Sequence, residues 1–299
     1  MPELPEVETT RRGIAPWMEG RRIRQLLVRE RRLRWPIPPR LGARLAGARV
    51  QRVGRRGKYL LLETSRGTAL LHLGMSGSLR VLEQVQAPGR HDHFDILLDG
   101  GYCIRFHDPR RFGSLLWAGS EPQAHPLLAN LGPEPLEAAF SGSYLHDRAR
   151  GRRLAIKPFI MNAAIVVGVG NIYASEALFR AGLHPCRAAQ RIPLAGMERL
   201  AGAVREVLDE ALALGGTTLR DFHGSGGEPG YFAQELRVYD RAGEACGSCG
   251  TPIRQFRQGQ RSTFFCPRCQ PRSGLSRPGP RPRGAGRPPP RPSRSRSPR

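Results

Sequence analysis

The sequence is poor in acidic residues, and this deficit is its first informative feature. Its 299 residues include 25 Asp and Glu against 48 Lys and Arg, which leaves a formal net charge of +23. Lys and Arg that neutralise phosphates supply most non-specific binding to nucleic acid. The shortage of acid therefore indicates a polyanionic partner, with an anionic membrane surface as the competing interpretation.

Long apolar runs and abundant aromatic residues are also missing. No run is long enough to span a bilayer, and the acidic N-terminus is not typical of a signal peptide. We therefore expect a soluble cytoplasmic chain without a membrane partner. Aromatic residues make up 7% of the chain, which offers no evident stacking platform for RNA. Only the Arg, Ser and Pro near the C-terminus favour an RNA-binding protein.

Cysteine is sparse, and four of the six cysteines are arranged as two Cys-x2-Cys pairs separated by 16 residues. The pairs are Cys246, Cys249, Cys266 and Cys269. Two such pairs predict a zinc ribbon, because each pair can wrap a tetrahedral ion. Four thiolates fill the coordination sphere, so we expect one structural Zn²⁺ without an activating water. Two disulfides are the alternative, although a reducing compartment fits the cysteine usage better.

The composition changes near residue 270. Residues 271–299 contain nine Arg, many Pro and Ser, no acid and one large apolar residue, Leu275. Such a segment cannot form a core, so it is predicted to be disordered. Removing its nine charges from +23 leaves +14. The rest of the chain is therefore basic in its own right.

The remaining chain changes from a strand pattern to a helix pattern. Short apolar runs at 59–63, 69–73, 94–98 and 102–106 are separated by turns with Gly, which is typical of a sandwich or barrel, and residues 4–18 are expected to begin with a helix. Apolar residues between 194 and 211 recur at three- and four-residue steps and end at Gly215 and Gly216. We therefore expect an α+β multidomain fold. Its parts are an N-terminal β-sandwich (1–131), a helical domain (132–240), a zinc-ribbon finger (241–270) and a disordered tail (271–299).

The first eight residues place a potential nucleophile beside three carboxylates. If Met1 is removed, Pro2 becomes a secondary amine with an ordinary pKa of about 7.7–8.0. That amine can attack an aldehyde-like carbon, and the resulting iminium is an electron sink for later eliminations. Glu3 can supply or accept the proton that opens a sugar ring. A disordered leader broken by Pro is the alternative.

Two strings carry a resemblance to a known family. The sequence from Met1 to Glu8 resembles the start of the formamidopyrimidine-DNA glycosylases, which excise oxidised purines from DNA. The string from Val166 to Glu176 resembles their helix–two-turns–helix motif, with Asn171 at the start of the second helix. The resemblance implies that Asn171 grips a DNA phosphate and that Lys157 and Arg152 extend this clamp. A structural glycine turn is the plainer interpretation of the second string.

The resemblance implies roles for further residues. Lys58 would reach the phosphate of the lesion and assist β-elimination, and Arg261 would contact the flanking phosphate and assist the final elimination. An extruded base leaves a hole in the duplex, and a flexible, a planar and a wedge-shaped side chain suit its filling. The residues implied for this task are Met75, Arg110 and Phe112, with His91 as a further DNA contact. Without the resemblance, Met75 and Phe112 would be core residues and His91 half of a metal site.

These interpretations together predict a bifunctional DNA glycosylase and abasic-site lyase of base excision repair. We expect a monomer that acts on damaged double-stranded DNA near the bacterial nucleoid. It would remove 8-oxoguanine and formamidopyrimidines through Pro2 and Glu3, and cleave the strand by β,δ-elimination. The related endonuclease VIII branch, which acts on oxidised pyrimidines, is one alternative. A zinc-ribbon DNA-binding protein without chemistry is another, and it would not need Pro2 at a free terminus.

Overall fold

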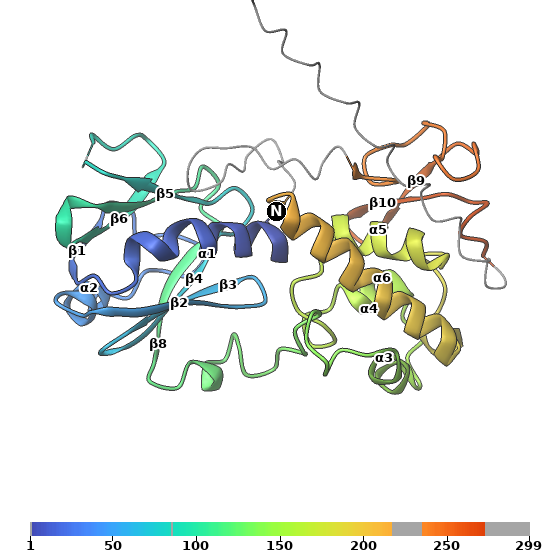
Figure 1. The fold of residues 1–299 in the computed structure, drawn as a ribbon, viewed down its shortest axis with the longest axis horizontal. Helices are drawn as coiled ribbons and strands as arrows, with labels where there is room; N and C mark the ends of the chain where they lie inside the picture. Colours follow the sequence, from blue (N-terminus) through green and yellow to red (C-terminus); the bar gives the residue numbers. More distant parts are fainter. Residues whose placement is uncertain (1, 85, 217–234, 273–299) are drawn as a thin grey trace, which may run out of the picture.

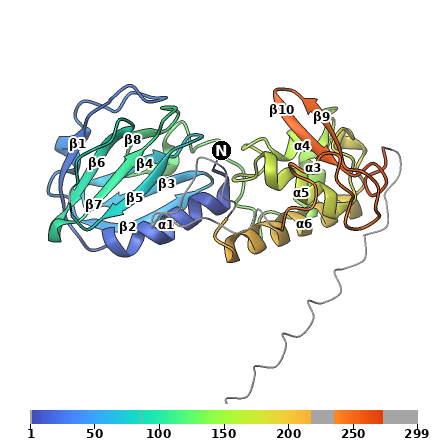
Figure 2. The same cartoon turned by 90° about the horizontal axis from the view of Figure 1, so that it is seen from above.

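The computed structural model describes residues 2–84, 86–216 and 235–272, which form two lobes (Figure 1). One lobe contains eight strands and helix α1, and the other contains helices α3 to α6 and a two-stranded hairpin. Figure 2 shows α1 lying along the first lobe and reaching toward α6 of the second. The predicted tail lies outside the described residues from residue 273 onward.

The first lobe is a sandwich of two antiparallel four-stranded sheets. One sheet has the order β1-β6-β7-β5, formed by Ile23–Val28, Asp92–Leu98, Cys103–His107 and Ser78–Leu82. The other has the order β2-β3-β4-β8, formed by Val50–Arg56, Tyr59–Thr64, Gly67–His72 and Ser114–Gly119. Short helices α2 (Leu41–Leu45), η1 (Asp99–Gly101) and η2 (Pro122–Ala124) lie in the connections. Apolar side chains from both sheets fill the space between them, where Phe94 stacks on Phe106.

Helix α1 (Leu4–Met18) connects the sandwich to the second lobe. Pro5 is tolerated because it stands in the first turn, where its missing N–H has no helical partner. The Glu6 carboxylate accepts a 2.8 Å hydrogen bond from the Glu3 N–H and so satisfies one free donor of the helix start. The Leu4 N–H donates to the Gly168 carbonyl at 3.0 Å. The N-terminus is thus fixed against the helical lobe.

The second lobe packs its helices around one apolar core. The helices are α3 (Gly142–Ala149), α4 (Ile156–Ile160), α5 (Asn171–Ala181), η3 (Ala189–Arg191) and α6 (Leu194–Ala213). The predicted long amphipathic helix is α6, whose buried side chains face this core. The chain turns after it at Gly215 and Gly216, which both have positive φ angles.

The finger follows as the hairpin β9 (Arg254–Gln258) and β10 (Arg261–Phe265), which packs against α5. Its apolar core includes Ile253 and Phe264, beside the four cysteines. In the part of the chain that the structure describes, no helix is long and apolar enough to cross a membrane. The predicted α+β fold, with a β-sandwich, a helical domain and a four-cysteine finger, is confirmed. The domain boundaries at 131, 240 and 270 stay predictions.

Candidate active site

The carboxylate of Glu3 lies where the N-termini of α1 and α5 converge. The side chain is buried, and its two oxygens accept hydrogen bonds from Gly170 N at 2.6 Å and Ile172 N at 3.0 Å. A side chain at position 170 would collide with the carboxyl group of Glu3, so only glycine permits this approach. The free backbone donors of α5 thus hold Glu3 directly after Pro2, which is itself buried.

The surroundings of Glu3 raise its pKa above the ordinary value of a glutamate. Burial raises the pKa of Glu3, whereas the cation of Lys58 and the backbone donors at Ile172 and Gly170 act in the opposite direction. The nearby carboxylate of Glu6 raises the pKa of Glu3 further. Glu6 is held by the Tyr173 hydroxyl, which donates to it at 2.6 Å. A carboxyl group so placed can hold a proton and deliver it, as a general acid requires.

Lys58 stands in the tight turn between β2 and β3, and that turn is docked onto the helical lobe. The Gly57 N–H donates to the Glu134 carboxylate at 2.7 Å, and Gly57 has a φ of 56°. Arg55 and Arg56 also donate to Glu134, at 2.7 and 3.0 Å. Burial lowers the pKa of Lys58, the charge of Glu3 opposes this, and the cation of Arg261 lowers it further. Lys58 is therefore electrostatically coupled to Glu3 and to Arg261, which are two of the other predicted catalytic residues.

Lys157 and Asn171 hold the strand that carries Arg261. The Lys157 ammonium donates to the Ser262 carbonyl at 3.0 Å and to the Thr263 hydroxyl at 2.8 Å. The Asn171 amide donates to the same Ser262 carbonyl at 3.0 Å. Burial lowers the pKa of Lys157 to about 8. These two predicted phosphate contacts therefore position β10 in this structure, while Arg152 is exposed.

The predicted void-filling side chains come from two loops at one end of the sandwich. Met75 lies in the β4–β5 loop, and Arg110 and Phe112 lie in the β7–β8 loop. Met75 is 36% exposed and Phe112 39% exposed, which argues against the alternative that they are core residues. The guanidinium carbon of Arg110 lies 5.0 Å from the centre of the Phe112 ring. His91 precedes β6, and its ring contacts that of His107 edge-on.

The four cysteines are arranged as a metal site. Their ligand atoms lie within 4.8 Å of one another, with Sγ separations of 3.9 Å for Cys246 and Cys269 and 3.5 Å for Cys249 and Cys266. A tetrahedral zinc site with Zn–S bonds of about 2.3 Å needs sulfur separations of about 3.8 Å. These separations exceed the roughly 2.0 Å of a disulfide bond, and none of the four cysteines is disulfide-bonded, so the two-disulfide alternative fails. The site fits one structural Zn²⁺, whose binding contributes folding free energy to the finger.

Removal of zinc is expected to unfold the finger. Replacing Cys266→Ser should abolish stoichiometric zinc and expose the β9–β10 amides to hydrogen exchange, because a four-thiolate site contributes about 10–16 kcal/mol of apparent binding free energy. Cys186→Ser is the matched control, since Cys186 lies outside the four-cysteine cluster. Metal analysis and amide exchange check both variants. Protected β10 amides in a metal-free protein would contradict this expectation.

Sequence reasoning missed the residues that position these groups. Tyr173 lies within the string from Val166 to Glu176, whereas Ser76, Asp108 and Glu134 lie in loops with Gly or Pro outside the two strings, and the partners of all four are far away in sequence. A further buried carboxylate, Glu176, accepts hydrogen bonds from the backbone of residues 237–239 and so joins α5 to the start of the finger. The only sequence feature that could have indicated these residues is a polar side chain inside an apolar or glycine-bearing segment.

Comparison with known proteins places this architecture in a family. Residues 1–115 match the formamidopyrimidine-DNA glycosylase N-terminal domain, residues 131–223 match the H2TH domain of the same enzymes, and residues 243–272 match a zinc finger found in FPG and IleRS. The formamidopyrimidine-DNA glycosylase of Alkalilimnicola ehrlichii is 62% identical over 276 residues, which cover 90% of this chain and all of the relative. That of Methylococcus capsulatus is 59% identical over 270 residues, with the same coverage.

Solved structures agree with the sequence relatives. The MutM (Fpg) protein of Thermus thermophilus has a TM-score of 0.82 and 39% identity, covering 91% of this chain and 100% of its own. A Lactococcus lactis FPG mutant in complex with DNA that contains Fapy-dG has a TM-score of 0.84 and 31% identity, covering 90% and 100%. Fold and site thus define a DNA-repair glycosylase with a DNA-binding helical domain and a zinc finger. The chain belongs to the formamidopyrimidine-DNA glycosylase family.

Proposed function

We propose that this chain is a bifunctional DNA glycosylase and abasic-site lyase that removes 8-oxoguanine and formamidopyrimidines from duplex DNA. The observation that carries the proposal is the buried Glu3 carboxyl group, which directly follows Pro2 and is coupled to Lys58. The Lactococcus lactis relative was solved with Fapy-dG DNA, which supports the substrate class. We further propose that the protein acts as a monomer in the bacterial cytoplasm.

The chemistry begins at the Pro2 nitrogen after Met1 has been removed. The amine attacks C1′ of the damaged nucleotide while Glu3 donates its proton to the ring oxygen O4′, and the C1′–O4′ bond breaks. The Pro2 nitrogen then gives up its own proton, its lone pair forms an iminium with C1′, and the base leaves with the electrons of the C1′–N bond to the base and takes up that proton. Because a secondary amine has no second proton to lose, the iminium retains its charge.

The iminium at Pro2 then accepts electrons during strand cleavage. Loss of a proton from C2′ expels the 3′ phosphate, and a second elimination expels the 5′ phosphate, which leaves a one-nucleotide gap. Lys58 and Arg261 support these steps, since cations beside the departing phosphates stabilise the developing negative charge. Lys157 and Asn171 contribute by holding β10, the strand on which Arg261 stands.

DNA engagement uses side chains from both lobes. Met75, Arg110 and Phe112 fill the space that the extruded base leaves, which lowers the cost of unstacking. His91 and the exposed Arg152 contact the DNA backbone. The excess of basic residues adds sequence-independent attraction to phosphates.

A comparison of two damaged duplexes tests the proposal. The protein is expected to act faster on 8-oxoguanine opposite cytosine than on thymine glycol, and the product ends should carry a phosphate on both sides of the gap. Release of the base from an intact strand would contradict the lyase assignment. Preference for thymine glycol would instead favour the endonuclease VIII branch, and binding without any turnover would favour a non-catalytic DNA-binding protein.

A further inference from the structure

Three loops of the sandwich meet at one buried residue, Asp108. Its Oδ1 accepts a 2.7 Å hydrogen bond from the Ser76 hydroxyl in the β4–β5 loop. Its Oδ2 accepts a 2.8 Å bond from Gly113 N, and Oδ1 also lies 3.3 Å from Arg110 N, both in its own β7–β8 loop. Asp108 is fully buried and Ser76 nearly so.

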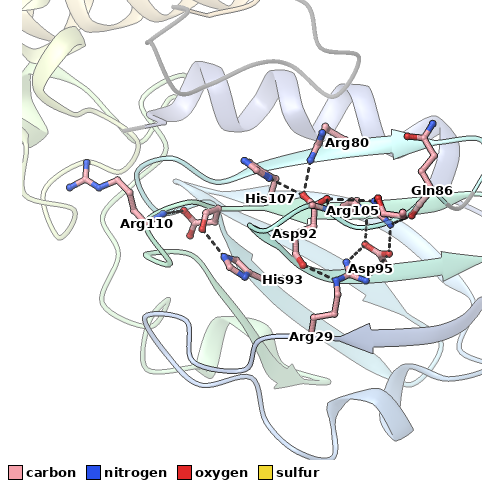
Figure 3. A network of polar contacts seen from close by, with 12 residues as sticks. Arg29, Arg80, Gln86, Asp92, His93, Asp95, Arg105, His107 and Arg110 are labelled. Atoms are coloured by element: carbon pink, nitrogen blue, oxygen red, sulfur yellow. Dashed lines mark hydrogen bonds and ion pairs between the residues drawn. The ribbon is translucent and has the colours of Figure 1, made fainter.

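The backbone of Asp108 reaches the third loop. Its N–H donates to the His91 carbonyl at 3.0 Å, and its own carbonyl accepts a 2.6 Å hydrogen bond from the Nε2 of His93. His93 lies at the start of β6 and is buried. Figure 3 shows His93 beside a network of Asp92, His107 and Arg105, with the Arg110 side chain extending away from the sandwich. Asp108 therefore contacts the loops of Met75, of His91, and of Arg110 and Phe112.

The β4–β5 and β7–β8 loops also touch through their backbones. A side chain at position 74 would collide with the backbone of Phe112 and Gly113, so Gly74 allows the two loops to lie directly against each other. Arg111 has a φ of 56°, which a non-glycine residue rarely adopts. Such a conformation persists where the surroundings fix it, and the bonds to Asp108 on either side of Arg111 do so.

Burial separates the supporting residues from the residues that they support. Asp108 and Ser76 are inaccessible, whereas Met75, Arg110 and Phe112 project from the surface. A group that must enter a duplex at the moment of base extrusion acts better when it is already ordered, since unordered loops would have to lose conformational entropy at that step. The contacts of Asp108 supply that order before DNA arrives.

We propose that Asp108 and Ser76 are positioning residues that hold Met75, Arg110 and Phe112 as one preassembled wedge for base extrusion. The proposal rests on the proposed function, because it takes over the assignment of those three side chains to the vacated space. It adds that the wedge is set by a buried hydroxyl–carboxylate pair that does not touch DNA. The pair should therefore matter most where extrusion is costly, as for a paired base, and least where the base is already absent.

Ser76→Ala tests the proposal with the least disturbance. It should slow single-turnover excision of 8-oxoguanine paired with cytosine by about 10-fold, the scale of one hydrogen bond to a carboxylate, while slowing cleavage at a preformed abasic site far less. Ser141→Ala is the matched control, because Ser141 also donates or accepts through one hydroxyl but caps α3 in the other lobe. It should change neither rate. Equal slowing on both substrates, or no slowing on either, would overturn the proposal.

A double-variant cycle separates positioning from general stability. If Ser76 acts through Arg110, then Ser76→Ala should cost little further excision in a protein that already carries Arg110→Ala. Full additivity would overturn the proposal. Asp108→Asn should slow excision more than Ser76→Ala does, because one acceptor becomes a donor that faces backbone N–H groups. If Asp108→Asn fails to fold, the cycle with Ser76→Ala and Arg110→Ala decides alone.

Amide exchange distinguishes failure of the inference from failure of the proposed function. Arg110 and Gly113 donate to the Asp108 and Ser76 side chains. In the absence of DNA, their amides should exchange faster in Ser76→Ala than in the unaltered protein. This result does not depend on which substrate the protein acts on. Unchanged exchange would overturn the preassembly. Faster exchange in a protein that processes no damaged duplex would refute the proposed function and leave the loop assignment intact.

Discussion

A protein that keeps one additional residue attached to the Pro2 nitrogen, after removal of Met1, is expected to lose base excision and strand cleavage together. The added residue converts the Pro2 nitrogen into a tertiary amide, which has no available lone pair for attack on C1′. Single-turnover excision should fall by at least about 1,000-fold, because removal of an enzyme nucleophile commonly costs several orders of magnitude. The measurement compares the extended chain with the same chain after a protease has exposed Pro2.

The paired design controls for folding. Both forms should contain one zinc and should bind an undamaged duplex with similar affinity, since the lobes and the finger are unchanged. Strand cleavage by the blocked form at the rate of the exposed form would show that another amine attacks the sugar. Lys58 would then be the first candidate, because burial lowers its pKa and so increases the share of free amine.

Glu3→Gln is expected to abolish base removal while duplex binding persists. The substitution keeps the size of the side chain but removes the proton that opens the sugar ring. We expect a loss of about 100-fold or more in single-turnover excision, the usual range for a positioned general acid. Glu8→Gln is the matched control on the same helix. The guanidiniums of Arg11, Arg12 and Arg55 lower the pKa of Glu8 to about 2, despite partial burial, so Glu8 cannot donate a proton at neutral pH.

The pH profile provides an independent check on Glu3. Burial raises the pKa of Glu3, so its acid form persists to higher pH than that of an ordinary glutamate. As the pH rises through that pKa, the acid form is lost and excision should slow. The Glu3→Gln protein has no such group, so its residual excision should lack this decline. Normal turnover by Glu3→Gln, or the same decline in both proteins, would exclude Glu3 as the required acid.

Local sequence patterns predicted much of the fold because they report on nearby residues. The cysteine spacing contained the whole metal site, since each knuckle needs only two residues between ligands. The period of apolar residues predicted α6, and the apolar runs predicted β3, β4, β6 and β7. Which strands share a sheet was not predictable in this way. The pattern allowed a sandwich or a barrel, and tertiary packing alone places β8 beside β4 and β5 beside β7.

The site shows the same division between local and long-range information. Glu3 was predicted from the first eight residues and Lys58 from the family resemblance, yet their electrostatic coupling depends on α5 and on the Glu134 contact to the Lys58 turn. The phosphate contacts of Lys157 and Asn171 stay predictions, and in this structure both side chains donate to Ser262, which lies 105 and 91 residues further along the chain. No spacing rule indicates a pairing at that separation. The role of Asp108 could not be predicted from the sequence either, because it arises from loops that meet only in the folded sandwich.

Borohydride trapping with peptide mapping identifies the nucleophile of this protein. The protein is mixed with a duplex that carries 8-oxoguanine, the iminium is reduced to a stable amine, and the DNA-linked peptide is identified by mass spectrometry. We expect one adduct on a peptide that begins at Pro2, with Met1 absent and the nucleotide remnant on the terminal nitrogen. An adduct on a lysine, with the Pro2 peptide recovered unmodified, would refute the assignment of Pro2 as the nucleophile.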